Sequence, residues 1–363
     1  MILTRSIGGA ALILAAAVWA IFRVAPAPVP ELPAYVEAIG NWRDNQYATT
    51  YAHLRENLVW QWTFEFSASS GLSIYLLQWL LVTLCVLSIL AFLYRGSAPP
   101  EYRGTAIRLA LLSPIVALLF GFFGSYDTVT ALLAMGLLIS WMQQRAWLVG
   151  IVSLLLGLQH VGQALPMILA LGLTWTALNE DSTSRQTLRV LAVGLGSAVL
   201  GKAVGLAILF FASSSTAGNR VPDGELFAPL RDAWVTSLNF LPAVIYSFLA
   251  GSWIIAAYVF WDGNRRRRIL LVCALATCAI PAFSLLDQTR IFMLLSLPGL
   301  SLITVHFMKS ADMSHTRIRV AEVAAWVGVP ILIWTGYTGA GRVQYMGALD
   351  AQLISWQQIF AWF

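Results

Sequence analysis

Charged side chains are scarce in this sequence, at 11% of its 363 residues, whereas apolar side chains make up 59%. A soluble domain carries about 25% charged residues, so this chain could not cover its surface with polar groups in water. The composition excludes a cytosolic enzyme, a secreted disulfide scaffold and a disordered tail. It predicts an all-α fold, a polytopic membrane protein in which residues 1–363 form a single integral membrane domain.

Cysteines and familiar motifs are also few. The three cysteines lie inside apolar runs, which argues against a disulfide framework or a metal knuckle. The sequence contains no internal repeat, Walker loop, dinucleotide fingerprint or zinc motif. The net charge is +5, but the basic residues are spread through loops, as membrane topology requires. We therefore expect no nucleic-acid partner.

Long apolar runs dominate what is present. A spanning helix needs roughly 20 apolar residues, and the runs predict about eleven spans. They cover residues 6–24, 71–93, 106–123, 127–142, 146–158, 164–178, 189–212, 237–261, 268–285, 291–307 and 320–336. The fifth and sixth runs form one apolar stretch that is interrupted only by Gln159-His160 and Pro166.

The basic residues set the predicted orientation. With the N-terminus inside, the inner loops carry fourteen Lys and Arg residues and the outer side seven, and Lys202 lies within a span. The positive-inside rule then predicts an N-inside, C-outside topology. The first apolar run resembles a signal peptide, but Arg23 follows it directly and prolines flank the small residues beyond it. We expect an uncleaved span there.

Three longer segments are predicted on the outer side, at residues 25–70, 213–236 and 337–363. In the first, the apolar spacing between Tyr47 and Leu58 favours an amphipathic helix along the membrane surface. Trp60 and Trp62 are expected at the interface, where indole rings are favoured. The last segment ends in several aromatic residues and is expected to form an interfacial helix.

Titratable side chains near the span ends are candidates for a functional site, because a polar group at membrane depth costs several kcal/mol unless it is paired or faces water. They are Asp127, His160, Lys202, Asp287 and Arg290. All but Lys202 lie at predicted outer ends of spans, as does the segment that carries Asp44. This shared level predicts an outward-facing polar cavity.

Each candidate also has a simpler interpretation. Asp287 and Arg290 are three residues apart and could form a helix-end ion pair. Asp127 could cap a helix N-terminus, and His160 could be a packing residue between two short spans. Lys202 could snorkel to the interface or pair with a carboxylate. The carboxylate in the first outer segment could simply be solvated.

Transfer of a sugar from a lipid phosphate suits such a cavity. It needs a carboxylate base to deprotonate the acceptor hydroxyl, cations such as Arg to hold the departing phosphate, and a site open to the bilayer for the lipid chain. The catalytic candidates are Asp44, Asp127 and His160. The substrate-binding candidates are Arg43, Tyr47, Arg55, Glu65, Lys202 and Arg290. A divalent metal (Mg²⁺ or Mn²⁺) is compatible with this chemistry, although no metal-ligand motif is present.

Two stretches carry a family resemblance. The residues Asp44-Asn-Gln-Tyr47, Phe64-Glu65 and Gly71-Leu-Ser-Ile-Tyr-Leu-Leu-Gln78 resemble the first outer loop and second span of EpsG-type and Wzy-type polysaccharide polymerases. The stretch from Ala146 to Leu165, with His160 just after an apolar run, is similar to another part of that family.

The chain departs from that family at the start of the fourth span. The family often has Arg-Gln there, where this chain has Tyr126-Asp127-Thr128. The acidic residue instead resembles the second outer-loop acid of GT-C glycosyltransferases, in which Asp44 would match the catalytic acid of the first outer loop. Together the resemblances cover roughly residues 35 to 165.

Both resemblances imply a multi-pass glycosyltransferase of the bacterial inner membrane, acting at its outer face on polyprenyl-linked sugars or oligosaccharides. Membrane lipids and proteins of envelope biosynthesis would be its partners. A flippase for lipid-linked saccharides is the alternative, although transporters often show repeated halves and this sequence shows none. A non-catalytic membrane subunit of a cell-envelope complex is a third interpretation.

Overall fold

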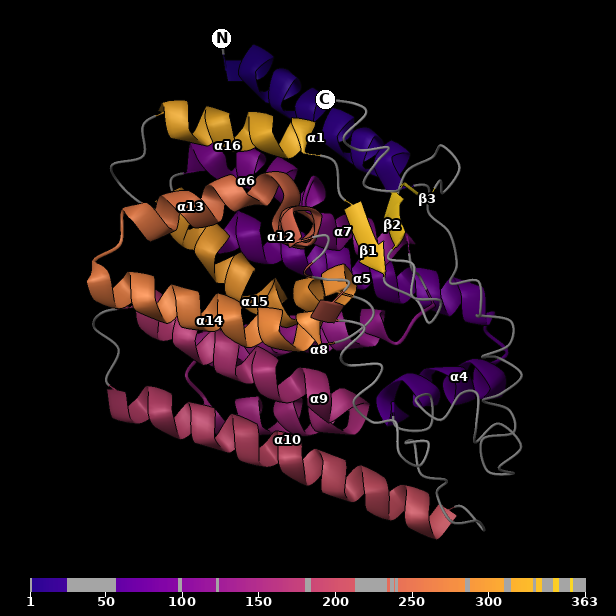
Figure 1. The fold of residues 1–363 in the computed structure, drawn as a ribbon. Coiled ribbons are helices and arrows are strands. Elements are labelled where there is room, and N and C mark those ends of the chain that lie inside the picture. The colour runs from indigo at the N-terminus through magenta and orange to yellow at the C-terminus, as the bar shows by residue number, and fades with distance from the viewer. Residues whose placement is uncertain are drawn as a thin grey trace.

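The computed structural model describes residues 2–24, 57–96, 100–121, 124–179, 184–212, 234–235, 238, 241–284, 288–309, 315–328, 331–334, 342–345 and 353–354. These residues are almost entirely helical (Figure 1). The helices are α1 (Ile2–Val24), α4 (Leu58–Ser70), α5 (Ile74–Gly96), η1 (Pro100–Tyr102), α6 (Arg103–Leu111), α7 (Pro114–Gly121), α8 (Asp127–Met142), α9 (Ala146–Leu178), α10 (Ser184–Ala212), α12 (Leu241–Leu249), η2 (Ala250–Ser252), α13 (Trp253–Trp261), α14 (Arg265–Phe283), α15 (Gln288–Lys309) and α16 (His315–Val327).

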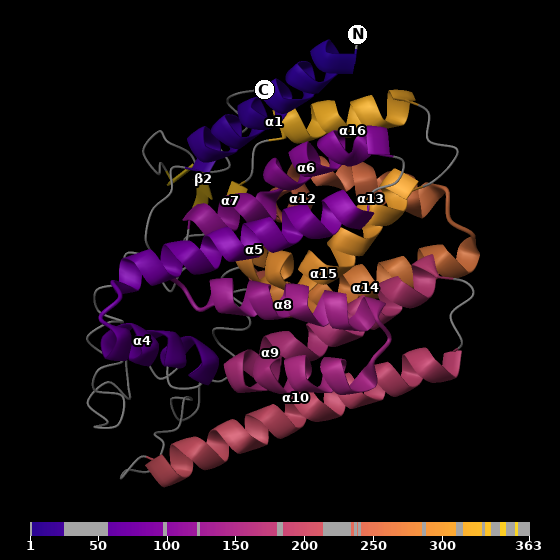
Figure 2. The same ribbon diagram turned by 180° about the vertical axis from the view of Figure 1, so that it is seen from behind.

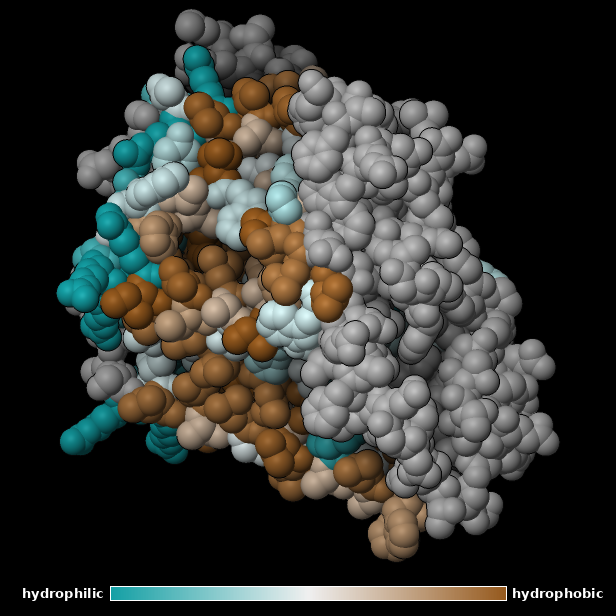
Figure 3. All heavy atoms as spheres, viewed as in Figure 1, coloured by the Kyte–Doolittle hydropathy of each residue, from teal (hydrophilic) through white to brown (hydrophobic). Residues whose placement is uncertain are grey.

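Several helices are compatible with a multi-pass membrane protein. Within the described ranges, five are long and apolar enough to cross a bilayer: Ile74–Gly96, Ala146–Leu178, Arg185–Phe211, Leu241–Trp261 and Gln288–Lys309. The bent pair of α6 and α7 would make a sixth. Figures 1 and 2 show the long helices running side by side. In Figure 3, hydrophilic side chains gather along the edge where α14 begins, and hydrophobic ones cover the middle of the face.

Helix α9 folds back on itself at His160, whose φ of −166° and ψ of 91° are not helical. A methyl group added at Gly194 of α10 would lie 3.1 Å from Ile168, 3.3 Å from Val149 and 3.4 Å from Ser153. Val149 and Ile168 would be about 28 Å apart along a straight helix. Both residues lie beside Gly194, so α9 consists of two antiparallel arms. Its 33 residues therefore do not form one straight span, although their length and composition alone would allow one. The break falls at the polar pair that interrupts the predicted fifth and sixth spans.

The first arm of α9 packs on α10 through glycines. A Cβ at Gly157 would lie 2.0 Å from the Ala198 carbonyl oxygen, and one at Gly201 would lie 2.2 Å from the Leu154 carbonyl oxygen. Only residues without a side chain allow the two backbones to approach this closely. Small residues at such crossings are typical of helix packing in membranes, where burying apolar surface provides little driving force.

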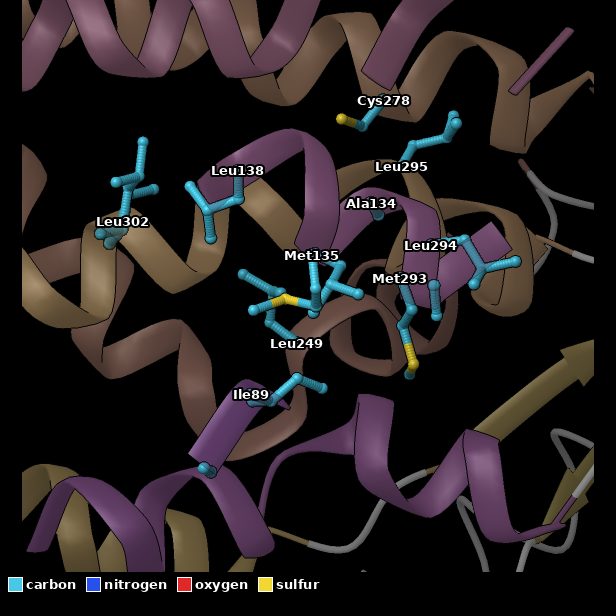
Figure 4. Packing of buried hydrophobic residues seen from close by; sticks show 14 of the residues in the cluster. Ile89, Ala134, Met135, Leu138, Leu249, Cys278, Met293, Leu294, Leu295 and Leu302 are labelled. Carbon is cyan, nitrogen blue, oxygen red and sulfur yellow. The ribbon is translucent and has the colours of Figure 1, made fainter. Parts of the chain in front are cut away.

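Helix α15 forms the centre of the core. Its residues are buried along nearly the whole length, and one apolar cluster joins them to α5, α8, α12 and α14. Figure 4 shows part of this cluster, in which Leu249, Met293 and Met135 come from three different helices. The central position of α15 fixes the residues at its first turn relative to the rest of the bundle.

Two predicted spans are broken. The span at 106–123 bends by 51° between α6 and α7. Pro114 begins α7 and cannot supply a backbone N–H to continue α6. The span at 237–261 is interrupted by η2, where Ala250 adopts a φ of +45°.

The C-terminal predictions are wrong where the structure describes that region. Helix α16 ends at Val327, and the predicted span at 320–336 continues as strand β1 (Ile331–Trp334). The stretch expected to form an interfacial helix contains β2 (Arg342–Tyr345) and β3 (Leu353–Ile354), which pair antiparallel in the order β1-β2-β3. The strands are rich in β-branched and aromatic residues, which fit a pleated sheet better than a helix.

Candidate functional site

Four segments meet at one end of the bundle, which we call the Asp127 end. Helix α8 begins there with Asp127, α9 folds there at His160, and α15 begins there two residues before Arg290. Helix α4 joins them through Trp60. The structure thus brings together Asp127, His160 and Arg290, three of the residues that the sequence places at predicted outer span ends.

A largely buried ion pair lies at the centre of the group. Arg290 Nε is 3.4 Å from Asp127 Oδ2, and the two side chains are 18% and 2% exposed. Ser125 Oγ donates a hydrogen bond to the same carboxylate oxygen at 3.1 Å. Asp127 occupies the first helical position of α8 and its side chain does not cap the helix; the preceding residue is the N-cap. The simple capping interpretation of Asp127 is therefore wrong.

Tyr126 connects the ion pair to the aromatic residues of the site. The Arg290 guanidinium donates a hydrogen bond to the Tyr126 hydroxyl at 3.3 Å and lies 5.7 Å from the centre of its ring. The Tyr126 and His160 rings are stacked, with centroids 6.0 Å apart and an angle of 21° between planes. Trp60 meets Tyr126 edge-on at 6.4 Å. Arginine and the aromatic rings thus form one continuous group.

Gln159 holds the backbone of the site in place. Its side chain is fully buried. Its Oε1 accepts a hydrogen bond from the Trp60 backbone N–H at 2.8 Å, and its Nε2 donates one to the Tyr126 carbonyl at 3.2 Å. One side chain therefore ties α4, the fold of α9 and the start of α8 together.

The turn at His160 is also organised by hydrogen bonds. The Gln163 backbone N–H donates to His160 Nδ1 at 3.2 Å, which orients the imidazole at the fold. The Gln163 side chain is 2% exposed, and neither of its polar atoms has a hydrogen-bond partner within the described part of the chain. A buried amide of this kind needs an explanation, and a ligand hydroxyl is one.

The first turn of α15 is anchored beside Arg290. Thr289 is fully buried, and its hydroxyl shares a 2.6 Å hydrogen bond with Ser247 of α12. This hydrogen bond joins α12 to α15 and fixes the position of the first turn of α15, from which the Arg290 side chain projects.

The remaining predicted site residues fall into two groups. Glu65 is exposed on α4, and Lys202 is half-buried on α10, one turn before the point where Gly205 approaches Leu58 and Leu158. Both helices reach the Asp127 end, α4 through Trp60 and α10 through Gly205. The second group lies outside the described residues: Arg43, Asp44, Tyr47, Arg55 and Asp287.

Sequence reasoning missed three members of the site. The sequence pattern indicates Tyr126 only as the neighbour of Asp127, and Gln159 only as an interruption between spans. Trp60, predicted to lie at the membrane interface beside Trp62, is fully buried, whereas Trp62 is 42% exposed. The available signal was the concentration of hydrogen-bonding and aromatic residues beside titratable ones at two predicted span ends.

The site supplies a carboxylate, a guanidinium, an imidazole and a phenol at the surface end of apolar helices. The carboxylate and imidazole can accept or donate a proton, and the guanidinium can bind phosphate oxygens. Within the described residues, no group of three or more His, Cys, Asp or Glu side chains is placed to hold a metal ion. Comparison of the chain with protein-family models, curated proteins and solved structures finds no match.

Proposed function

We propose that the protein is a membrane-embedded glycosyltransferase that uses a polyprenyl phosphate or diphosphate sugar as donor. The observation that carries the proposal is the Asp127–Arg290 pair at the end of the bundle, joined to Tyr126 and His160. Arg290 lies in the first turn of the buried helix α15, and the proposal puts the head group of the lipid carrier at this end of the bundle. The planar fork of arginine suits a phosphate better than an ammonium does.

The proposed roles follow from the chemistry of the side chains. Arg290 binds the departing phosphate and compensates its growing charge. A carboxylate removes the proton of the acceptor hydroxyl, and Asp127 and Asp44 are the two candidates for this base, with His160 as the alternative. The buried amide of Gln163 and the aromatic rings around Tyr126 would contact the sugar.

The finer parts of the proposal concern topology and setting. About eleven spans with the N-terminus inside would put the Asp127 end on the outer face of a bacterial inner membrane. The acceptor would then be a saccharide of the cell envelope. A polymerase and an enzyme that adds one sugar would use the same groups.

A flippase for lipid-linked saccharides is the second candidate, favoured by the two broken spans, α6/α7 and α12/η2/α13. Discontinuous helices commonly form the substrate sites of transporters. The test is sugar transfer by the purified full-length chain in nanodiscs, with lipid-linked donors of different sugars. A product that depends on the protein supports transfer. Translocation of the lipid-linked sugar in vesicles without any transfer would replace the proposal with the flippase.

A further inference from the structure

Cations gather at the end of the bundle opposite the Asp127 end, which we call the basic end. Helices α8, α9 and α15 end there, and α10, α14 and α16 begin there. The Arg267 guanidinium donates a hydrogen bond to the Ala177 carbonyl at 3.3 Å, which joins the start of α14 to the end of α9. Arg317 forms an ion pair with Asp262, which joins the start of α16 to the end of α13. Figure 3 shows hydrophilic side chains along the edge where α14 begins.

Two of the four consecutive arginines of α14 are held by the protein itself. Arg268 donates hydrogen bonds to the last two carbonyls of α13, at 3.2 Å and 2.7 Å, and Arg267 is held by the end of α9. The other two, Arg265 and Arg266, are exposed, and neither has a hydrogen-bond or ion-pair partner in the described part of the chain. These two guanidinium groups can therefore bind an external anion.

An apolar stripe runs along α14 from these two arginines. Ile269, Val272 and Ile280 are 52%, 52% and 59% exposed, and their spacing from Arg265 keeps all four residues on one face of the helix. With a rise of 1.5 Å per residue, the stripe extends from about 6 Å to about 22 Å beyond Arg265, about the thickness of one leaflet of a bilayer. Trp261, at the end of the preceding helix, is 66% exposed, and indole rings favour the membrane interface.

Helix α10 repeats this arrangement. Arg185 and Arg189 are exposed at its start, without a hydrogen-bond or ion-pair partner among the residues that the structure describes. Arg189, Leu200 and Phe211 recur every eleven residues, about three helical turns, so they lie on one face. Leu200 is 53% and Phe211 84% exposed. Two separate helices thus present exposed arginines at the basic end and exposed apolar side chains along the same face.

The chemistry of the face specifies its partner. Two carboxylates of the basic end, Asp262 and Glu322, already pair with Arg317 and Arg108. A soluble anion would neutralise the exposed arginines but would leave the apolar stripe without a partner. A molecule with an anionic head and an apolar chain matches both parts of the face.

We infer that α14 binds an anionic phospholipid, whose phosphate contacts Arg265 and Arg266 and whose acyl chain lies along the apolar stripe. Each cation close to an anionic leaflet favours association by about fivefold. The inference goes beyond the proposed function and does not depend on it, because such binding needs neither a sugar donor nor an acceptor.

Photo-crosslinking with two lipids tests the inference without any turnover. The purified full-length chain is placed in phosphatidylcholine nanodiscs that contain a small fraction of a photoreactive lipid. This lipid is either phosphatidylglycerol or phosphatidylcholine, with the same diazirine-bearing acyl chain, and labelled peptides are identified by mass spectrometry. We expect phosphatidylglycerol to label residues 269–280 at least several-fold more than phosphatidylcholine does. Equal labelling of this stretch by the two lipids would overturn the inference.

Variants make the test specific. Arg265→Gln combined with Arg266→Gln should lower the preference for phosphatidylglycerol by about fivefold or more. Its labelling by phosphatidylcholine should not change, which would show that α14 is still folded and faces the bilayer. Arg220→Gln combined with Arg231→Gln is the matched control, because it removes the same net charge from the predicted outer segment 213–236. An equal loss of preference in both double variants would mean that only the net charge matters, and would contradict a site on α14.

Two further conditions separate a lipid from a soluble anion. If excess inorganic phosphate at constant ionic strength removes the preference for phosphatidylglycerol, the arginines bind a soluble anion and the inference is wrong. Raising the salt concentration from about 0.1 M to about 1 M shortens the screening length from about 10 Å to about 3 Å, so the preference should fall. A preference that is independent of salt would exclude recognition of the lipid through the charge of Arg265 and Arg266.

Discussion

Removing the charge of Asp127 separates a catalytic role from a structural one. Asp127→Asn keeps the shape of the side chain but can neither take a proton nor balance the charge of Arg290, 3.4 Å away. At an effective dielectric constant of about 20, two unit charges at this distance attract by about 5 kcal/mol before desolvation is subtracted. Measured losses on breaking a buried pair are about 3–5 kcal/mol. We expect a destabilisation at the lower end, because Arg290 is 18% exposed.

The expected loss of activity is larger than instability alone would give. General-base catalysis is worth about 10²–10⁴-fold, so Asp127→Asn should lower the rate of sugar transfer by that order in protein that remains folded and inserted. The assay is product formation per mole of purified protein, with thermal unfolding in detergent measured in parallel. Asp127→Asn with full activity would refute a role for Asp127 in the reaction.

Two companion variants make the interpretation firm. The pair of Arg108 on α6 and Glu322 on α16 is the matched control, since it is also largely buried but belongs to other helices. Glu322→Gln should destabilise the protein similarly without a comparable loss of rate. Asp127→Asn combined with Arg290→Gln should recover part of the stability, because neither charge is left unpaired. If activity recovers in the same proportion, the pair is structural and the proposed roles are wrong.

Three further predictions concern the base, the scaffold and the topology. Asp44→Asn should lower sugar transfer by about 10²–10⁴-fold if Asp44 is the base. Glu31→Gln is the control and should not lower it, because Glu31 follows the proline-rich stretch 25–30. Full activity of Asp44→Asn would shift the role of base to Asp127, Glu65 or His160. Gln159→Leu leaves the Trp60 N–H without its acceptor and should cost about 1–3 kcal/mol in thermal unfolding experiments, together with part of the activity; an unchanged melting temperature would argue against its positioning role. A single cysteine introduced at Arg266 in an otherwise cysteine-free chain should react with a membrane-impermeant reagent only from the inside, and labelling from the outside would contradict the predicted orientation.

Apolar helices could be predicted where their signal is local. Apolar runs at 127–142 and 71–93 correspond to α8 and α5 within a few residues. The polar pair Gln159-His160 marks the fold of α9 because a turn inside an apolar run needs hydrogen-bonding groups. The eleven-span topology itself stays a prediction. The strands of the C-terminal stretch could not be foreseen, because a short apolar run does not distinguish a strand from a helix.

For the candidate site, the sequence predicts which titratable residues lie at the outer ends of spans, but not how they contact one another. Burial costs single out Asp127, His160 and Arg290 from the sequence, but they do not indicate which residues pair. Asp287, the obvious partner of Arg290 by spacing, lies outside the described residues. The pair that the structure describes is with Asp127, 163 positions away in the chain. Contacts of that separation depend on how α8 and α15 pack, and no local pattern encodes them. The same holds for Gln159, whose two bonds reach Trp60 and Tyr126.

The distribution of polar groups bears on the choice between transfer and transport. A transporter must open its substrate site to each side of the membrane in turn, and this polar site accordingly lies near the middle of the membrane. Here the arginine, carboxylate and aromatic residues form their group at one end of the bundle. By contrast, a small pocket between the broken spans and α15 is lined mostly by apolar residues such as Ile89, Leu249 and Met293. A saccharide that moved from the Asp127 end past the broken spans would lose the hydrogen-bonding groups of that end and meet mostly apolar side chains. The arrangement therefore favours chemistry on a head group held at one surface, which is the requirement of a transferase.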